Sequence, residues 1–433
     1  LHMQHYLPQH LAYYQTAITA SSEIASVAAL DALLLHTNRE QALLADVNAM
    51  TAQSVLTLNQ WQVHGLLDNV QSGDNVAQYN SQVLSSTSPI ATMAQLQTLI
   101  DAVNASVAAF SAVQAAAGGD SSQISLAQLE AILTLQHVTA QHYQAYLTAL
   151  AQVDAINSVS ELDALLQLTN QEQALLALLN STDSNNPLTL AQWQADSLLA
   201  ELQAGDYLSA YNTEVLLRQP LSTISEAQQL VTQVNASVSA LSRIQAAAGG
   251  DTSQLTEADF TAILHLTQLD SSLLPFYLSA IAARDAVADV ADLDQLLLAV
   301  NQQQALLTLV NGISGSAGLT MAQWQLHDLL TQVRDVPYVA AYNAEAVLRQ
   351  PLSQVTSVQQ LVDEVNASVS AFLKVQAAAG GDSSGISDND FSAILHMQHY
   401  LPQHLAYYQT AITASSEIAS VAALDALLLH TNR

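Results

Sequence analysis

Two groups of histidines have side chains and spacing that could bind a metal ion. In each group the first two are three residues apart, and an i, i+3 pair on one helix face can supply two ligands. The groups are identical: His2, His5 and His10 near the start, and His396, His399 and His404 near the end. In our alignment the neighbouring units lack histidine at these positions. We therefore favour partly exposed helical histidines and expect no metal site.

A second motif could bind calcium. Gly-Gly-Asp followed by Ser or Thr occurs at 118–120, 249–251 and 380–382. These segments lack the alternating oxygen ligands and the distal bidentate Glu of an EF-hand. We therefore expect a helix C-cap followed by a solvated turn. The acidic loop 181–186, which occurs once, leaves both interpretations open.

Three Asn-Ala-Ser sequons could accept a glycan, at Asn104, Asn235 and Asn366. Each lies inside a predicted helix. Asn235 is four residues after Val231 and three before Val238, which places it on the apolar stripe. A glycan would have no room there, so a structural role is favoured.

The chain lacks the residue patterns of the common hydrolases and nucleotide-binding enzymes. It contains no Gly-x-Ser-x-Gly, no His-Glu-x-x-His, no phosphate-binding glycine loop and no dinucleotide fingerprint. It also has no cysteine, which excludes disulfides, thiolate metal sites and a cysteine nucleophile. We expect no enzyme, no catalytic residue and no cofactor.

Large rings recur at fixed positions and could form a stacking platform for a carbohydrate. One ring per fixed position of a helical repeat is more often part of the core. Core packing is therefore favoured for the rings of this series, which are Trp61, Trp193, Trp324, Tyr79, Tyr146, Tyr211, Tyr277, Tyr342 and Tyr408.

Composition narrows the classes of partner. The 433 residues include 8 Lys and Arg against 37 Asp and Glu, a net charge of −29. So acidic a chain repels phosphate backbones, so nucleic-acid binding is not expected. Half of the residues are apolar, enough for a large core, but no run approaches the 18 or more apolar residues of a membrane span. We expect no membrane insertion, and no signal peptide is visible.

Three homologous units of about 131 residues follow one another. Val-Asn-Ala-Ser-Val recurs with its asparagine at 104, 235 and 366, and each unit carries one Leu-Thr-x-x-Gln-Trp-Gln. The markers divide the chain into a truncated unit 1–103, units 104–234 and 235–365, and a partial unit 366–433.

Each unit contains two half-repeats of about 65 residues. An asparagine recurs every 65 or 66 residues, at Asn38, Asn104, Asn170, Asn235, Asn301, Asn366 and Asn432. A large residue follows each of the first six by 23 to 25 positions and a tyrosine by 41 or 42. The half-repeats alternate between two forms, A (with Asn38, Asn170, Asn301 and Asn432) and B (with the sequons).

Residues 1–39 recur without a change as residues 395–433. Because sister units are only about half identical, a perfect copy 394 residues away indicates one period of a longer protein plus an overlap. Both chain ends fall inside predicted helices, which favours this interpretation over a cloned duplication, although the duplication stays open.

The local patterns are helical throughout. From Leu230 the apolar residues follow the spacing of one helix face, which predicts a helix from about 225 to 248, ending at Gly249-Gly250. A shorter helix opens with a capping box in nearly every half-repeat, and a third carries the tyrosine. No segment alternates as a strand does. The predicted fold is all-α: a tandem array of ~65-residue three-helix half-repeats joined by long continuous helices, as a rod or an α-solenoid.

Several of these motifs together resemble a known class of proteins. Leu-x-x-Leu-Leu, Val-Asn, the Gly-Gly-Asp loop and the Leu-Thr-x-x-(Asp/Gln) helix start look like the tandem helical repeats of giant secreted or surface proteins of bacteria, often described as adhesin-like. The resemblance covers the whole chain and carries no catalytic residues. It implies an extracellular or cell-surface location and a structural or adhesive role.

Two functions are open at this point. The first is a structural protein that forms an extracellular bacterial fibre, filament or stalk, whose partner is the chain itself. A surface with few charges can pack against copies of itself at small desolvation cost. The second is an α-solenoid adhesion module that recognises a peptide or a glycan.

The repeating asparagine carries the sharpest expectation. An unpaired buried amide costs about 1–3 kcal/mol, so six copies on the apolar side of long helices imply six satisfied amides. We expect each to bond main-chain groups of an adjacent loop, and so to fix the rotation of one half-repeat on the next. The long helices should run through Asn170, Asn235 and Asn301 without a break.

Overall fold

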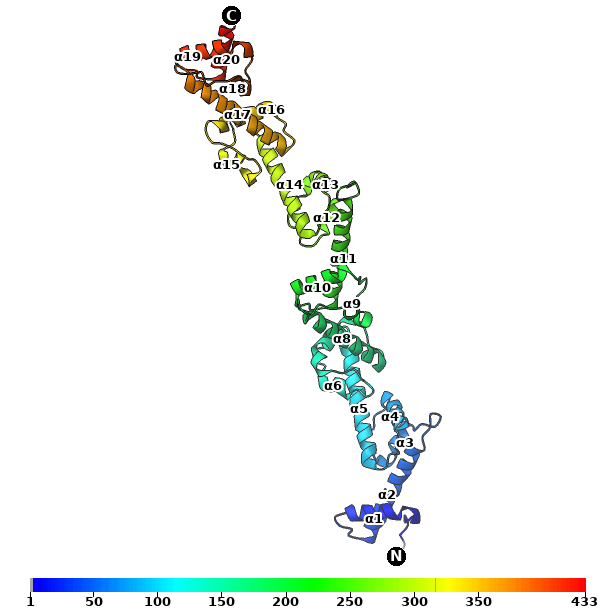
Figure 1. Cartoon of the computed structure of the whole chain (residues 1–433). Coiled ribbons are helices and arrows are strands. Elements are labelled where there is room, and N and C mark those ends of the chain that lie inside the picture. The colour runs from blue at the N-terminus through cyan, green and yellow to red at the C-terminus, as the bar shows by residue number, and fades with distance from the viewer. Residues whose placement is uncertain (1–2, 316) are drawn as a thin grey trace. The chain divides into compact units, whose positions relative to one another are not determined.

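The computed structural model describes residues 3–315 and 317–433, and its regular secondary structure is helical (Figure 1). The described residues contain helices α1 to α20, seven short 3-10 helices and three isolated β-bridges, and no strand. The all-α prediction is therefore confirmed. The chain divides into two compact units, Leu1–Val231 and Thr232–Arg433.

The longest helices contain 22 to 24 residues and carry the repeating asparagines. They are α2 (Val27–Asn48), α5 (Met93–Ala116), α8 (Val159–Asn180), α11 (Ile224–Ala247), α14 (Val290–Asn311) and α17 (Val355–Ala378), and the shorter α20 (Val421–Thr431) is the last of the series. The helix predicted at 225–248 is α11. The prediction that helices pass unbroken through Asn170, Asn235 and Asn301 is confirmed by the bounds of α8, α11 and α14.

Helices of four to six residues follow, each opened by a capping box. In α9, Gln192 Oε1 accepts the Thr189 N–H at 2.8 Å, and Thr189 Oγ1 accepts the Gln192 N–H at 3.3 Å. These two bonds satisfy donors that a helix start leaves unpaired. The helices are α3 (Leu58–Trp61), α6 (Leu126–Ala131), α9 (Leu190–Trp193), α12 (Glu257–Thr261), α15 (Met321–Trp324) and α18 (Asp388–Ala393).

A third set of helices carries the tyrosines. They are α1 (Leu11–Ala20), α4 (Asp74–Ser85), α7 (Tyr143–Gln152), α10 (Asp206–Arg218), α13 (Leu274–Ala282), α16 (Tyr338–Arg349) and α19 (Leu405–Ala414). The 3-10 turns η1 (Pro8–His10), η3 (Ala140–His142), η5 (Ser271–Leu273) and η7 (Pro402–His404) lead directly into four of them. The other three 3-10 turns come directly after short capped helices. They are η2 (Val63–Gly65), η4 (Ala195–Ser197) and η6 (Leu326–Asp328).

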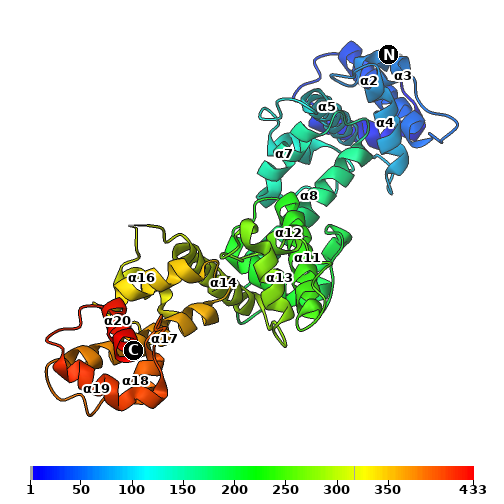
Figure 2. The same ribbon diagram turned by 90° about the horizontal axis from the view of Figure 1, so that it is seen from above.

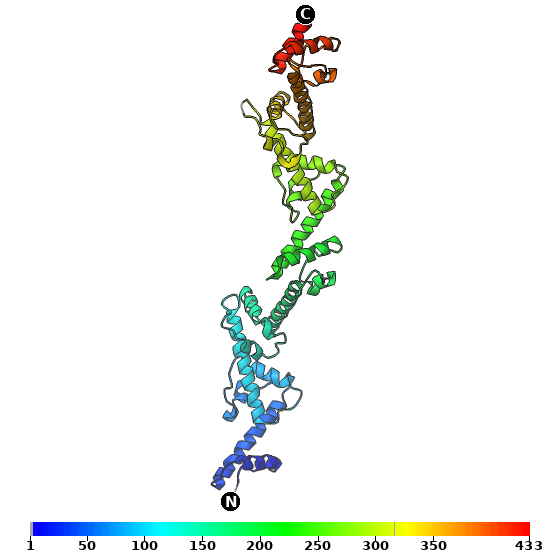
Figure 3. The ribbon, with the colours of Figure 1, turned by 60° about the vertical axis from the view of Figure 1, so that its left-hand side comes forward.

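Each core forms where a short capped helix and a tyrosine helix pack against long helices. In the second unit, α16, α18 and α19 all pack on α17, and α19 also packs on α20 (Figure 2). Figure 3 shows the brown-orange α17 leading from the yellow segment into the red one. The predicted ring series is buried at every position, so these rings belong to the core and leave no face for a carbohydrate.

One described helix, Met93–Ala116, is long and apolar enough to cross a membrane, judged by length and composition alone. This differs from our expectation that no segment is long and apolar enough to span a membrane, which was based on uninterrupted apolar runs. The mean hydropathy of this helix stays high despite Gln95, Asp101 and Asn104, because the helix is rich in Ala, Val and Leu. In the fold this helix buries Leu96, Ile100 and five other residues against its neighbours.

Candidate functional site

At six positions the repeating asparagine bonds the loop that precedes a tyrosine helix. Asn170 Nδ2 donates to the His137 carbonyl at 2.8 Å, and the Tyr146 hydroxyl donates to Asn170 Oδ1 at 2.6 Å. The Tyr146 oxygen also accepts the Thr139 N–H at 2.9 Å. The Asn170 amide thus bonds a carbonyl of the loop, and the Tyr146 hydroxyl bonds one of its N–H groups. The same arrangement occurs in the pairs Tyr14–Asn38, Tyr79–Asn104, Tyr277–Asn301, Tyr342–Asn366 and Tyr408–Asn432.

The predicted bond from the amide to a neighbouring main chain is therefore present. The tyrosine hydroxyl was not predicted as its second partner. Asn366 is buried, whereas the other asparagines are half-buried, so they sit at the edge of the apolar stripe and not at its centre. Tyr211 and Asn235 belong to different compact units and are outside this comparison.

A second polar side chain, seven residues before the asparagine, holds the same loop. In A-type helices it is an aspartate, as where Asp163 Oδ1 accepts the N–H groups of Gln136 and His137 at 2.7 and 3.0 Å. In B-type helices it is a glutamine, as where Gln97 accepts the Asp68 N–H and donates to the Asp68 carbonyl. Seven residues are two helical turns, so both side chains share one helix face. The equivalent residues are Asp31, Asp294, Asp425, Gln228 and Gln359.

A third polar side chain, ten residues after the asparagine, bonds the loop just before the next long helix. Asn180 donates to the Leu221 carbonyl at 2.8 Å and accepts the Leu221 N–H at 2.7 Å, three residues before α11 begins. The equivalent side chains donate to a carbonyl of the corresponding loop. The pairs are Asn48–Ile90, Asn311–Leu352, Gln114–Ile156, Gln245–Ala288 and Gln376–Ile418. We call the side chains at −7, 0 and +10 the loop anchors. The end of one long helix thereby holds the start of the next.

The serine of each Asn-Ala-Ser sequon holds a different loop. Ser106 Oγ accepts the Leu133 N–H at 2.9 Å, and Ser237 and Ser368 do the same for Leu264 and Leu395. Within one motif, Asn104 therefore faces the loop before it and Ser106 the loop after it. These bonds support the structural interpretation of the sequon.

Each tryptophan is bonded to an asparagine of the following tyrosine helix. Trp61 Nε1 donates to Asn80 Oδ1 at 3.1 Å, and Asn80 Nδ2 donates to the Leu56 carbonyl at 2.9 Å. The Tyr79 ring lies beside the indole, with centroids 5.5 Å apart. Trp193 with Asn212 and Trp324 with Asn343 repeat the arrangement. The indole N–H is thus satisfied in the core.

The described histidines of the two groups lie in loops and 3-10 turns, so the expected helical context is wrong for His5, His10, His396, His399 and His404. His5, His137 and His399 each pair with the −7 aspartate, as where His137 Nδ1 lies 2.8 Å from Asp163 Oδ2. His137 and His142 lie at the positions equivalent to His5 and His10, so the expectation that the neighbouring units lack histidine there is also wrong. Because Asp163 takes the loop N–H groups, the loop cannot continue as a helix.

The described histidines at the positions of His5 and His10 bond the side chains of the loop anchors. His10, His142 and His404 bond the asparagine anchors, with Nδ1 to Oδ1 distances of 2.7 to 2.8 Å. His2 lies outside the described residues. In the part of the chain that is described, no group of three or more His, Asp or Glu could hold a metal ion. Burial raises the pKa of Asp163, but the N–H groups of Gln136 and His137 and the His137 ring lower it more, so this pKa lies below its ordinary value.

The Gly-Gly-Asp segment is a turn that ties a long helix to a tyrosine helix. Gly118 has φ +69°, and its N–H donates to the Leu150 carbonyl at 3.0 Å. A Cβ here would lie 2.9 Å from the Val153 carbonyl oxygen, so the position requires glycine. Asp120 Oδ1 accepts the Ser122 N–H at 2.9 Å, and hydrogen bonds from Ser122 lower the Asp120 pKa. These contacts match the turn that we favoured over a calcium loop.

The acidic loop 181–186 has a similar internal arrangement. Asp183 Oδ1 accepts the N–H groups of Asn185 and Asn186 at 2.7 and 3.0 Å. Hydrogen bonds from the Asn186 side chain and the loop N–H groups lower the pKa of Asp183.

An apolar groove of about 570 Å³ lies in the second unit between α16, α17, α20 and the loop after α18. Its apolar lining includes Leu348, Phe372, Leu395, Val421 and Leu429. Its polar lining is Glu345, Ser368, His396, Gln398, His399 and Asp425. The groove has no counterpart among the predicted sites, because it depends on how helices far apart in sequence are placed.

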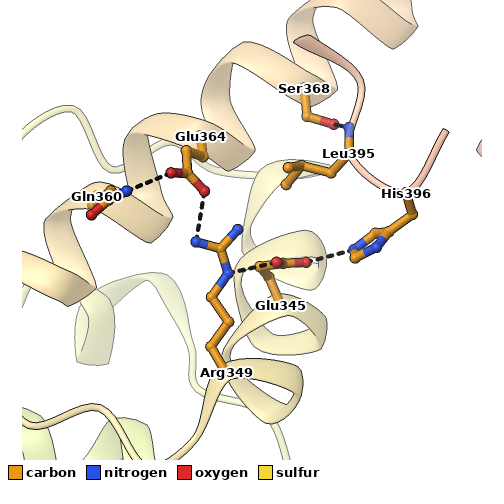
Figure 4. A network of polar contacts seen from close by, with 7 residues as sticks. All are labelled: Glu345, Arg349, Gln360, Glu364, Ser368, Leu395 and His396. Carbon is orange, nitrogen blue, oxygen red and sulfur yellow. Dashed lines mark hydrogen bonds and ion pairs between the residues drawn. The ribbon is translucent and has the colours of Figure 1, made fainter. Parts of the chain in front are cut away.

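A charged network borders this groove (Figure 4). The buried Glu345 accepts from Arg349 Nε at 2.6 Å and lies 2.8 Å from His396 Nε2, and Arg349 also pairs with Glu364 at 2.6 Å. Burial raises the pKa of Glu345, but His396 and Arg349 lower it more, so this pKa lies below its ordinary value. An i, i+4 Glu–Arg pair on a predicted helix was the sequence signal for this network.

The network is not a constant part of the repeat. Around Asn104, Gln82, Ser86 and Thr134 occupy the positions that correspond to Glu345, Arg349 and His396 around Asn366. No protein-family model, curated protein or solved structure matches the chain.

Proposed function

We propose that the chain is a structural protein, a tandem array of ~65-residue three-helix half-repeats that forms an extracellular bacterial fibre, filament or stalk. The observation that carries the proposal is the set of loop anchors. Two anchors hold the loop beside their own helix, and the third holds the loop before the next long helix. A chain linked in this way resists bending between successive half-repeats, as a fibre must.

The polar groups that could have done chemistry support this assignment. The sequon residues Asn104 and Ser106, the loop residue His137 and the turn residue Asp120 are each bonded within the fold. None of them is held ready for a substrate. We infer that the chain acts without catalysis and without a cofactor.

An extracellular or cell-surface location belongs to the same proposal. The chain has only 8 Lys and Arg, and five of them form ion pairs: Arg218, Arg243, Arg284, Arg349 and Lys374. Few trypsin sites are an advantage outside a cell. Brief treatment of intact cells with a protease of broad specificity, which does not need Lys or Arg, should remove the native protein while cytoplasmic markers stay intact.

Electron microscopy of the native material tests the fibre. Continuous filaments in which the half-repeats recur along the axis are expected. Monodisperse short particles, seen over the full range of concentration, would contradict it.

The groove beside Glu345 favours a second candidate, an adhesion module that binds an apolar peptide segment. Replacing Ala344, an exposed groove residue, with Trp should fill the groove and abolish peptide capture. The matched change Ala422→Trp, at a lining residue on α20, should do the same. Unchanged filaments with lost peptide binding would favour the module, whereas a peptide library without any binder would exclude it.

A further inference from the structure

The groove beside Glu345 combines an apolar lining with charges of one sign. Leu348, Phe372 and Leu429 are among its apolar residues, and Leu348 is 68% exposed. Its described lining also includes two carboxylates, Glu345 and Asp425, and no Lys or Arg. A volume of about 570 Å³ lies within the range of ligand-binding pockets, so the groove has room for side chains of a partner.

The charges around the groove do not cancel. Arg349 is shared between Glu345 and Glu364, at 2.6 Å from each, so these three residues keep one negative charge. Asp425 adds a second one. Burial raises the pKa of Asp425, but the loop N–H groups and the imidazole that it bonds lower this pKa more, so the carboxylate is ionised at pH 7. The groove therefore favours a cation over an anion.

The two histidines that line the groove present hydrogen-bond acceptors. His396 Nε2 lies 2.8 Å from Glu345 Oε2. His399 Nδ1 lies 2.7 Å from Asp425 Oδ2. Each of these nitrogens faces an ionised carboxylate, so it carries the proton of the neutral ring and leaves a lone pair on the other nitrogen. In the described part of the chain no group bonds His396 Nδ1 or His399 Nε2, so the lining suits an ammonium or guanidinium group, which only donates.

The wall of the groove that α20 contributes is open in each copy of this helix. Two residues of the wall, Ala422 and Ala426, are exposed. The residues at the same positions of α8 and α14, which further half-repeats follow, are exposed as well. They are Ser160, Ala164, Ala291 and Gln295. The fold of the half-repeat itself therefore leaves this helix face free.

The apolar lining is not shared by all copies of the repeat. Ser85 in α4 and Gln167 in α8 take the positions of Leu348 and Leu429. Because polar residues are accepted there, apolar residues at these positions are not needed to hold the array together. The composition of the groove is a property of this one half-repeat.

An occupant of the groove has to bring partners for its own backbone. Much of the lining consists of aliphatic and aromatic side chains, which cannot pair with N–H and C=O groups. An extended segment would bury some of these groups unpaired. A helix pairs them internally and presents apolar residues three and four positions apart, the usual way in which a helix fills a groove.

We infer that the groove is a docking site for an amphipathic helix of a partner protein, which carries Lys or Arg beside the apolar residues that enter the groove. The inference rests on the adhesion module, the second candidate function, and states which segments that module selects. The apolar lining holds the apolar face of the helix. The excess carboxylate charge and the imidazole acceptors select the sign of the charge beside it.

Two labelled helical peptides with the same apolar pattern test this selection, one with Lys and one with Glu beside the apolar face. Fluorescence anisotropy with the full chain at pH 7 should show the Lys peptide bound about tenfold more tightly, because like charges brought together disfavour the wrong partner. Gln398 is an exposed lining residue. Gln398→Lys should weaken binding of the Lys peptide and strengthen that of the Glu peptide, and Gln398→Glu should do the opposite.

Ala344→Trp should abolish binding of the Lys peptide by filling the groove. Ala340→Trp, at an exposed residue of α16 outside the lining, is the matched control. Circular dichroism checks that each variant keeps the helix content of the unmodified chain. Equal binding of the two peptides would overturn the inference and leave the module standing, whereas no binding of either would overturn both. Self-association in sedimentation velocity that Ala344→Trp removes would identify a second copy as the occupant and also overturn the inference.

Discussion

At the residue scale, the asparagine anchor works because its amide has two different ends. Asn301 Nδ2 donates to the Gln268 carbonyl at 2.7 Å, while its Oδ1 accepts the Tyr277 hydroxyl. An aspartate would lose the donor, and a leucine would lose both ends. The same side chain could therefore be kept at this position while its neighbours in the helix vary.

We expect Asn301→Ala to lower the free energy of unfolding by about 1–3 kcal/mol, because it leaves the Gln268 carbonyl and the Tyr277 hydroxyl without this partner. Urea denaturation measures the loss, and the exposed Asn59→Ala is the control. Tyr277→Phe combined with Asn301→Ala should cost less than the two single changes together, since they share one bond. Strict additivity would show that the two side chains act independently. The same loss is predicted for Asn235→Ala.

The aspartate anchors make stability depend on pH. Burial raises the pKa of Asp294, but Thr267 and the Gln268 N–H lower it more, to below its ordinary value of 3.8. An aspartate whose pKa is lower in the folded chain than in the unfolded chain stabilises the fold at pH values above its unfolded pKa of about 3.9. This stabilisation is lost as the pH falls through the folded pKa. Asp294→Asn should therefore be less stable than the unmodified chain at pH 6, and the difference should shrink as pH falls from 4 to 2.5. Asp46→Asn, at an exposed carboxylate, supplies the baseline, and a pH-independent difference would argue against the assignment.

At the element scale, the long helix sets the geometry between anchors. Asp163, Asn170 and Asn180 lie on one unbroken helix, so their spacing and rotation are fixed by the 1.5 Å rise and 100° turn of each residue. The loops that they hold have no regular structure of their own. The positions of these loops are therefore set by the anchors on α8.

An alanine inserted between Gln173 and Ala174 should test this directly. It rotates Asn180 by about 100° relative to Asn170, so the bonds to Leu221 cannot form together with those to His137. We expect the urea midpoint to fall, with a loss of about 1–3 kcal/mol for the stranded groups alone. The same insertion between Ser184 and Asn185, at the tip of an exposed turn, disturbs only the local bonds to Asp183 and should cost less. Equal effects at both sites would refute the role of the helix.

The bounds of several helices were predictable from the sequence. The apolar stripe and Gly249 placed the end of α11 within a residue, and the Thr189–Gln192 pattern placed the start of α9, because both are local signals. The −7 and +10 anchors were missed although their spacing from the asparagine is constant. The Tyr146–Asn170 bond could not be predicted, because it depends on how two helices cross.

At the scale of the whole molecule, we expect low charge density to govern association between copies of the chain. The net charge of −29 is spread over 433 residues, only 10% of which are charged. Carboxylates supply nearly all of this charge, so protonation removes the repulsion between copies. We therefore predict lateral contacts between copies that bury more than the ~1,000 Å² of a specific interface.

We expect light scattering to increase as the pH is lowered from 7 toward the sequence pI of 4.3. The increase should be reversible on return to pH 7, and added salt at pH 7 should reproduce part of it by screening. Circular dichroism at each pH separates association from unfolding. Dispersed monomers at every pH and concentration would rule the idea out.

The regular placement of the anchors also bears on how such a gene can change in length. The A-type helices α2, α8 and α14 each present an Asp, an Asn and a second Asn at the same offsets. Unequal crossing-over between the codons of two such helices joins the front of one to the back of the other. The hybrid helix keeps all three anchors, and the loops on either side meet the partners they already had. Repeats can therefore be gained or lost in single recombination events, with no junction left to be repaired by later mutation.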